Sequence, residues 1–122
     1  MNGPRILLVE DDPDNRRLLQ TMVLKLGCAV DAVADGESAL AALGGASYAC
    51  VLMDVQLPGI DGLEATRRLR ESGLTGLPVI AVTAHAMQGD RERCLKAGMN
   101  AYLTKPLTLE MLGKALREAG VG

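Results

Sequence analysis

The sequence predicts an α/β fold in which one five-stranded parallel sheet has helices on both faces. Five short apolar segments alternate along the chain with five segments whose apolar residues recur at helical spacing. Each β-then-α pair has about the minimum length of a parallel crossover. Because such crossovers are right-handed and both faces of the sheet need cover, the alternation favours a small doubly wound (βα)5 sandwich of three layers.

The first β-then-α unit has the clearest signals. Residues 5–10 (RILLVE) form a short continuous apolar run, which is typical of a strand covered on both faces. Residues 12–27 then carry apolar side chains at helical spacing. Asp12 suits the N-cap of this helix, Pro13 its first turn and Gly27 its C-terminal end.

The next two apolar segments differ in strength. Residues 28–35 (CAVDAVAD) predict a weaker strand, and the Ala-rich residues 36–45 a short helix that ends at two glycines. Residues 48–54 (YACVLMD) form a strong apolar run that stops at a carboxylate, Asp54. An ionised carboxylate beside an apolar core is unfavourable unless a partner neutralises it, so Asp54 is a candidate site residue.

The second half of the chain repeats the pattern. Residues 61–73 predict a helix, because Asp61 and Glu64 have the spacing of a capping box. Residues 77–83 (LPVIAVT) predict the fourth strand. The remaining predicted elements are a polar-faced helix at 88–98, a short strand at 101–104 (AYLT) and an amphipathic helix at 107–120.

The composition is that of one soluble globular domain. The chain has 122 residues, of which 48% are apolar and 23% charged, and predicted elements reach nearly to both ends. We therefore expect one domain, residues 1–122, with no output domain. The net charge of −2 argues against nucleic-acid binding, and no apolar run predicts a membrane span or a signal peptide. The cysteines are odd in number and have no close pair (Cys28, Cys50, Cys94), which argues against a disulfide framework and against a zinc site. This pattern fits the reducing environment of the cytoplasm.

Polar side chains gather where four of the predicted strands end. The carboxyl ends of parallel strands meet at one edge of a doubly wound sheet, where such folds bind ligands. The residues at these ends are Glu10, Asp11, Asp12, Asp54, Thr83, Thr104 and Lys105. Clustered carboxylates need a cation, and a few oxygen ligands with room for water and phosphate suit Mg²⁺. With a lysine and a threonine opposite, this edge could transfer a phosphoryl group to Asp54 as nucleophile.

Four motifs give the chain a family resemblance. In order they are LLVEDD, LMDVQLPGIDG, VIAVTAHAM and YLTKPL, each at a predicted strand end. Together they resemble the receiver domains of two-component response regulators over essentially the whole chain. The VTAHAM motif is particularly similar to that of receivers fused to hybrid histidine kinases, which suggests a role in a phosphorelay. The resemblance implies a flavodoxin-like fold with strand order 2-1-3-4-5.

The resemblance also implies a set of metal ligands. Asp54 accepts the phosphoryl group and Asp11 binds Mg²⁺ directly, while Glu10 acts through water. The backbone carbonyl of Gln56 completes the protein ligands. Mg²⁺ is the implied cofactor, with Mn²⁺ as a substitute. Asp12 lies one position beyond the acidic pair, and we assign it to helix capping instead of metal binding.

The implied switch residues lie on the last two strands. Thr83 and Lys105 contact the phosphoryl oxygens, Lys105-Pro106 is a cis peptide, and the rotamer of Tyr102 follows Thr83. The face formed by the fourth helix, the fifth strand and the fifth helix is the implied protein-binding surface. The implied phosphodonor is a histidine kinase or a histidine phosphotransfer protein. We expect a monomer or a phosphorylation-dependent dimer, with no catalysis beyond self-phosphorylation and autodephosphorylation.

Gln56 and His85 are candidate tuning residues, because each lies two positions beyond a site residue. Gln56 would shield or orient an attacking water. His85 is the only histidine in the chain, and we favour a solvent-facing loop residue over a phosphohistidine relay. Taken singly, each candidate also has a structural interpretation. Asp54 alone would suit a turn cap, and Tyr102 a half-buried strand aromatic.

Two other functions compete with a phosphorylation switch. An aspartyl-nucleophile phosphatase of the haloacid-dehalogenase type needs a second acid two residues after the nucleophile, where this chain has Gln56. A flavin or nucleotide binder needs a phosphate-binding loop after the first strand. Here that loop is the acidic EDDPDN, which repels phosphate unless a metal is present.

Overall fold

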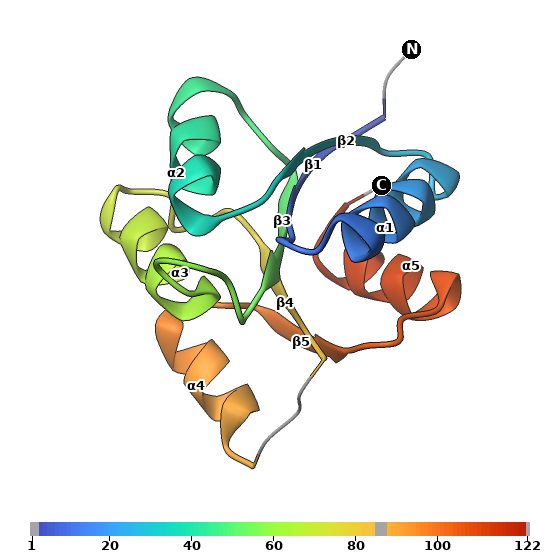
Figure 1. The fold of residues 1–122 in the computed structure, drawn as a ribbon. Coiled ribbons are helices and arrows are strands. Elements are labelled where there is room, and N and C mark those ends of the chain that lie inside the picture. The colour runs from blue at the N-terminus through green and yellow to red at the C-terminus, as the bar shows by residue number, and fades with distance from the viewer. Residues whose placement is uncertain (1–2, 85–87, 122) are drawn as a thin grey trace.

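The computed structural model describes residues 3–84 and 88–121 of the chain, in which five strands alternate with five helices (Figure 1). The strands are β1 (Arg5–Val9), β2 (Ala29–Val33), β3 (Cys50–Asp54), β4 (Val79–Thr83) and β5 (Ala101–Thr104). The helices are α1 (Pro13–Lys25), α2 (Gly36–Gly45), α3 (Gly62–Glu71), α4 (Asp90–Ala97) and α5 (Leu109–Glu118).

The strands form one parallel sheet in the order β2-β1-β3-β4-β5, which confirms the expected doubly wound topology. Every residue of β3 and β4 is buried, whereas the edge strands β2 and β5 are half-buried throughout. The strands that carry the apolar runs therefore lie at the centre of the sheet, as their composition predicts.

Helices cover both faces of this sheet (Figure 1). On one face α1 and α5 pack against side chains such as Ile6 and Leu8. On the other face α2, α3 and α4 pack against the alternate side chains, such as Leu7 and Val9. Successive residues of a strand point to opposite faces, so the apolar run in β1 supplies both cores.

The predicted helix caps are confirmed. Asp12 Oδ2 accepts a hydrogen bond from the backbone N–H of Asn15 at 2.9 Å, and Asp61 Oδ1 accepts one from Glu64 at 2.9 Å. Gly27 follows α1 with φ of 85°, in the left-handed region that suits glycine. The two aspartate caps satisfy N–H groups that have no partner within the first turn of a helix.

The predicted elements are correct in type and order, but their ends differ by one or two residues. The third strand begins at Cys50 instead of residue 48, and the fourth at Val79 instead of residue 77. Pro78 has no N–H with which to continue a ladder, which explains the later start of β4. The fourth helix begins at Asp90, two residues after its predicted start.

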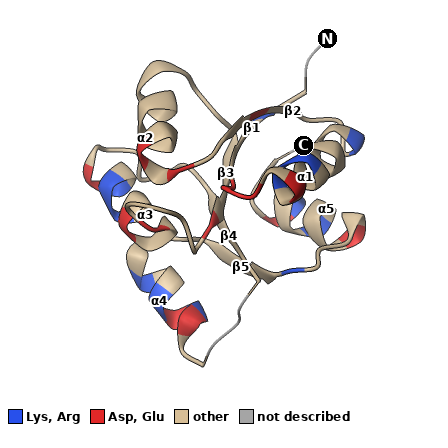
Figure 2. Cartoon of the chain, in the orientation of Figure 1, with Lys and Arg blue, Asp and Glu red and all other residues tan. Residues whose placement is uncertain are grey.

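Charged residues lie mainly on the helices and loops, where acidic and basic side chains are mixed (Figure 2). Acidic residues also mark the segment that leads from β1 into α1 (Figure 2). No helix within residues 3–84 and 88–121 combines the length and apolar character that crossing a membrane requires.

Candidate functional site

The backbone ladder continues past the carboxyl ends of the strands and fixes the residues that follow them. The N–H of Glu10 donates to the carbonyl of Val33 at 3.0 Å. The N–H of Lys105 donates to the carbonyl of Thr83 at 2.8 Å. The backbones of Glu10 and Lys105 are therefore hydrogen-bonded to the neighbouring strands β2 and β4 at the sheet edge.

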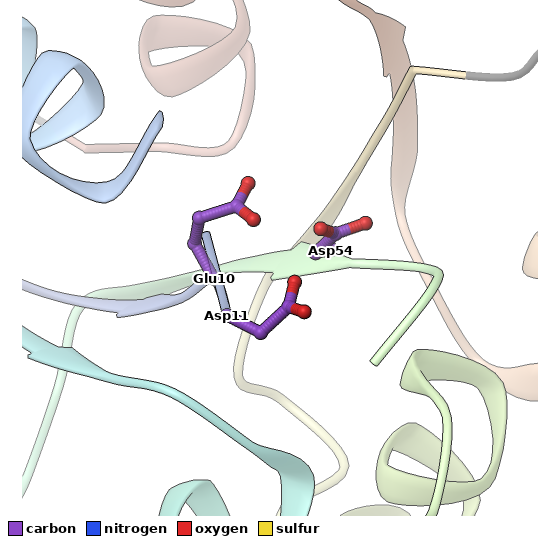
Figure 3. Close-up of side chains that lie close together, drawn as sticks. All are labelled: Glu10, Asp11 and Asp54. Atoms are coloured by element: carbon purple, nitrogen blue, oxygen red, sulfur yellow. The ribbon is translucent and has the colours of Figure 1, made fainter. Parts of the chain in front are cut away.

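Three carboxylates meet at this edge. Glu10, Asp11 and Asp54 each offer an oxygen that lies within 4.8 Å of those of the other two (Figure 3). Glu10 is 1% exposed and Asp54 is 7% exposed, while Asp11 lies open to solvent. Oxygen ligands of this kind, with one side open to water, fit Mg²⁺, which keeps several of its own waters.

Lys105 neutralises part of this negative charge. Its Nζ lies 2.5 Å from Glu10 Oε1 and 3.6 Å from Asp54 Oδ2. The lysine side chain is 15% exposed, so the ion pairs are largely shielded from water. The closer partner of Lys105 is thus Glu10. Asp54 shares the Lys105 ammonium with Glu10.

Asp54 lies in surroundings that favour its neutral form. Burial is the main cause that raises its pKa, to about 7, and the nearby Glu10 carboxylate raises it further. The backbone N–H of Gln56, which donates to Asp54 Oδ1 at 3.0 Å, opposes this rise, as does Lys105. A bound divalent cation would reverse the balance, because it stabilises the ionised carboxylate.

We expect the carboxyl group of Asp54 to titrate near pH 7 in EDTA and at least about one unit lower in saturating Mg²⁺. In the unfolded chain an aspartate titrates near pH 4, so between about pH 4 and 7 the native state holds the extra proton. Stability without divalent cation should therefore fall as pH rises through this window. Carboxyl-carbon NMR measures the titration. In Asp54→Asn, the decrease of Tm with rising pH should be smaller than in the wild type. A midpoint near 4 in EDTA would contradict this expectation.

Two other predicted residues, Thr83 and Tyr102, lie on β4 and β5. Thr83 ends β4 and is 2% exposed, in register with Thr104. Tyr102 packs with the core on the α2–α4 side, and burial raises the pKa of its hydroxyl. Its Oη is buried with no hydrogen-bond partner among the described atoms. His85 lies outside the described residues.

Two structural expectations near the site are confirmed. The Lys105-Pro106 peptide is cis. Asp12 caps α1 through its side chain, and its N–H donates to Glu10 Oε2 at 3.2 Å. The three residues whose carboxylates cluster are Glu10, Asp11 and Asp54, so Asp12 serves the helix and orients Glu10.

The sequence reasoning missed two residues that shape this edge. Gly62 begins α3 with its N–H bonded to the carbonyl of Val55 at 2.9 Å, and its Cα faces the backbone of Asp54. Arg16 on α1 donates to the backbone carbonyls of Glu10 and Asp11. A glycine at the first position of a helix and an arginine one turn past an acidic run were the available signals.

Comparison with known proteins identifies the family. Residues 6–117 match the model of the response regulator receiver domain. The chain is 41% identical over 118 residues to the sensor protein GacS of Pseudomonas syringae pv. syringae, covering 93% of the chain and 13% of GacS. It is 44% identical over 111 residues to the sensor histidine kinase RcsC of Escherichia coli K12, covering 91% of the chain and 12% of RcsC. The chain thus spans only a small part of these relatives.

A solved structure supports the same conclusion. The receiver domain of the sensor histidine kinase PA1611 of Pseudomonas aeruginosa PAO1 is 45% identical and aligns with a TM-score of 0.89, covering 97% of this chain and 98% of that one. That protein holds a magnesium ion in its active site cleft. With the same fold, an acidic cluster that fits Mg²⁺ and a family match over most of its length, this chain belongs to the receiver domains of response regulators.

Proposed function

We propose that the chain works as a phosphorelay receiver in which Asp54 accepts a phosphoryl group. The observation that carries the proposal is the position of Asp54: a buried carboxylate at the end of the central strand, beside two further acids and 3.6 Å from the ammonium of Lys105. No stability argument explains this concentration of charge, since isolated burial of carboxylates is unfavourable. A site for a cation and a phosphoryl group does explain it.

The donor in this proposal is a phosphohistidine on a histidine kinase or a histidine phosphotransfer protein. An oxygen of ionised Asp54 attacks the phosphorus, a P–O bond forms, and the P–N bond to the imidazole breaks. The imidazole nitrogen keeps the electron pair and takes a proton from water. Asp54 is held for in-line attack because Gln56 N–H fixes one oxygen and leaves the other directed toward Lys105.

Mg²⁺, when bound, supplies positive charge that offsets repulsion between the carboxylates and the incoming phosphoryl oxygens. The ligands that we assign to it are the carboxylates of Asp11 and Asp54 and the backbone carbonyl of Gln56, with Glu10 acting through water. Gln56 carries no acid with which to protonate a leaving group, which disfavours the phosphatase alternative. We assign Gln56 and His85 to tuning the lifetime of the phosphoryl group.

The proposed switch begins at Lys105 and Thr83. Lys105 is engaged with Glu10 at 2.5 Å, so a phosphoryl group on Asp54 competes for the same ammonium and draws it across the site. The Thr83 hydroxyl would donate to a second phosphoryl oxygen. The rotamer of Tyr102 then follows Thr83, and its buried Oη has no hydrogen bond among the described atoms to lose when the side chain rotates.

We propose the face formed by α4, β5 and α5 as the surface for protein binding. Tyr102 lies on β5, and exposed apolar side chains such as Leu95 on α4 and Met111 on α5 lie on the flanking helices. Phosphorylation would favour a minor conformation of this face that exists beforehand. The working state is a cytoplasmic monomer or a dimer that forms on phosphorylation.

The direct test is to incubate the protein with Mg²⁺ and acetyl phosphate and to measure intact mass. We expect one added phosphoryl group in the wild type, and none in Asp54→Asn or in EDTA. Asp61→Asn is the matched control, because it removes a carboxylate seven residues along the chain that caps α3 and does not belong to the acidic cluster found among the described residues. Labelling of Asp54→Asn at the wild-type level would exclude Asp54 as the acceptor.

Lys105→Met should separate phosphorylation of Asp54 from the conformational change in α4, β5 and α5. We expect this variant to gain the phosphoryl group, while the chemical-shift changes in α4, β5 and α5 fall to about half or less of the wild-type values, because the lysine no longer moves toward the phosphoryl oxygen. Amide NMR spectra before and after phosphorylation measure both effects. Full wild-type shift changes in the variant would rule out the proposed role of Lys105.

A further inference from the structure

A side chain of α1, that of Arg16, contacts the loop that carries the acidic residues. Arg16 Nη1 donates to the backbone carbonyl of Glu10 at 3.0 Å and to that of Asp11 at 3.4 Å. Arg16 is half-buried, so its guanidinium lies against the loop instead of extending into solvent. One nitrogen therefore bridges two successive carbonyls, and these belong to two of the three clustered acids.

The residues of this loop are not held equally. The N–H of Glu10 bonds to Val33, and a Glu10 oxygen accepts from the N–H of Asp12. Asp12 in turn caps α1 by accepting from Asn15. Asp11 is exposed, and its carboxylate takes part in none of the hydrogen bonds or ion pairs found within residues 3–84 and 88–121. Among the described residues, the Asp11 carbonyl accepts from Arg16, and the N–H of the same peptide group, that of Asp12, donates to Glu10.

We propose that Arg16 is a positioning residue for the divalent-cation site. By holding the carbonyls of Glu10 and Asp11, it fixes the backbone from which both carboxylates turn toward Asp54. This inference rests on the proposed function, in which these three acids bind Mg²⁺. Residues that orient metal ligands through hydrogen bonds typically change metal affinity by about 10- to 100-fold when they are replaced.

The charge of Arg16 makes the proposal easy to test. A positioning role and a purely electrostatic role predict opposite changes in Mg²⁺ affinity when Arg16 is removed. A cation near a Mg²⁺ site opposes binding, so removing it should tighten binding if charge alone mattered. If Arg16 acts by position, its removal loosens the loop and weakens binding. Arg17 is the matched control: it is the next residue on α1, and within the described residues its side chain pairs with Asp14 alone, with both groups well exposed.

The experiment is calorimetric titration of Mg²⁺ into metal-free protein at a temperature where circular dichroism shows each variant to be folded. We expect Arg16→Met to raise the Mg²⁺ dissociation constant by about tenfold, and Arg17→Met to leave it within about twofold of wild type. Arg16→Lys keeps the charge but not the fork of donors, so we expect an intermediate loss of about threefold. Arg16→Lys also serves as the test if Arg16→Met does not fold.

A second measurement separates positioning from general damage. At saturating Mg²⁺ the rate of labelling by acetyl phosphate in Arg16→Met should return to near the wild-type value, whereas at low Mg²⁺ it should be depressed. Binding by Arg16→Met or Arg16→Lys that equals or exceeds wild type would overturn the inference. If wild type itself fails to bind Mg²⁺, the proposed function fails, which is a different result.

Discussion

Replacing Gly62 with alanine is expected to lower the free energy of unfolding by about 3 kcal/mol, at the upper end of the range for overpacking. A Cβ at this position would overlap the backbone oxygen of Asp54 and lie 3.0 Å from the Cα of Val55. Both neighbours are backbone atoms, one in the last residue of β3 and one in the residue after it, so they cannot rotate away as a side chain can. The loop after β3 must shift, and Asp54 shifts with it.

The measurement is chemical denaturation, with Tm as a second readout; a loss of this size corresponds to roughly 10 °C in a domain of this length. Gly44→Ala in α2 is the control, because a Cβ there meets nothing within 4 Å. Alanine favours helix, so the control should match wild type or gain up to about 1 kcal/mol. If the two variants have equal stability, the close approach at Gly62 has been misjudged. Labelling by acetyl phosphate should also slow in Gly62→Ala but not in Gly44→Ala.

Arg70→Met should reduce the free energy of unfolding by about 2 kcal/mol, because several half-buried acceptors lose a charged donor together. The Arg70 guanidinium donates five hydrogen bonds. They reach the carbonyls of Leu74, Leu77 and Gly98 and the side-chain oxygen of Asn100. One side chain thereby ties the end of α3 to the loop before β4 and to the connection between α4 and β5. Methionine keeps the apolar stem and removes the donors.

Arg67→Met is the matched control for Arg70. Arg67 lies on the same helix, but its guanidinium pairs with Glu64 alone in the part of the chain that the structure describes, and both groups are about half exposed. Such pairs contribute about 0.2–1 kcal/mol, so the control should be close to wild type. Urea denaturation measures both variants, and hydrogen exchange should show faster exchange around Gly98 only in Arg70→Met. Equal losses in the two variants would mean that the five bonds add nothing beyond an exposed ion pair.

Arg70 also shows what helical periodicity can and cannot reveal. The buried positions of α3 are Gly62, Ala65, Thr66 and Leu69, and Arg70 lies four residues after Thr66 on the flank of this stripe. Its phase therefore separates it from the exposed Arg67 and Arg68 beside it. Periodicity could have marked Arg70 as half-buried. It could not have named Gly98 as a partner, since that contact joins residues 28 apart in the sequence.

Local signals in the sequence were enough to predict the fold class, the order of the elements and the edge at which the site lies. Apolar runs, helical spacing and capping residues are local signals, and the parallel topology forces the strand ends together whatever the details of packing. Asp54 and Lys105 could be singled out for this reason. The same logic placed Asp12 at a helix cap, because a cap is a contact within three residues.

Which groups contact one another across that edge could not be predicted from local signals, because it depends on tertiary packing. Lys105 lies 95 residues from Glu10 along the chain yet pairs with it more closely than with Asp54. Two other contacts likewise depend on how a helix packs against a strand end. They are the hydrogen bonds from Arg16 to the acidic loop and the close approach of Gly62 to Asp54. Such distances depend on the packing of the whole core, and differences of an ångström that decide a hydrogen bond or a clash leave no periodic trace in the sequence.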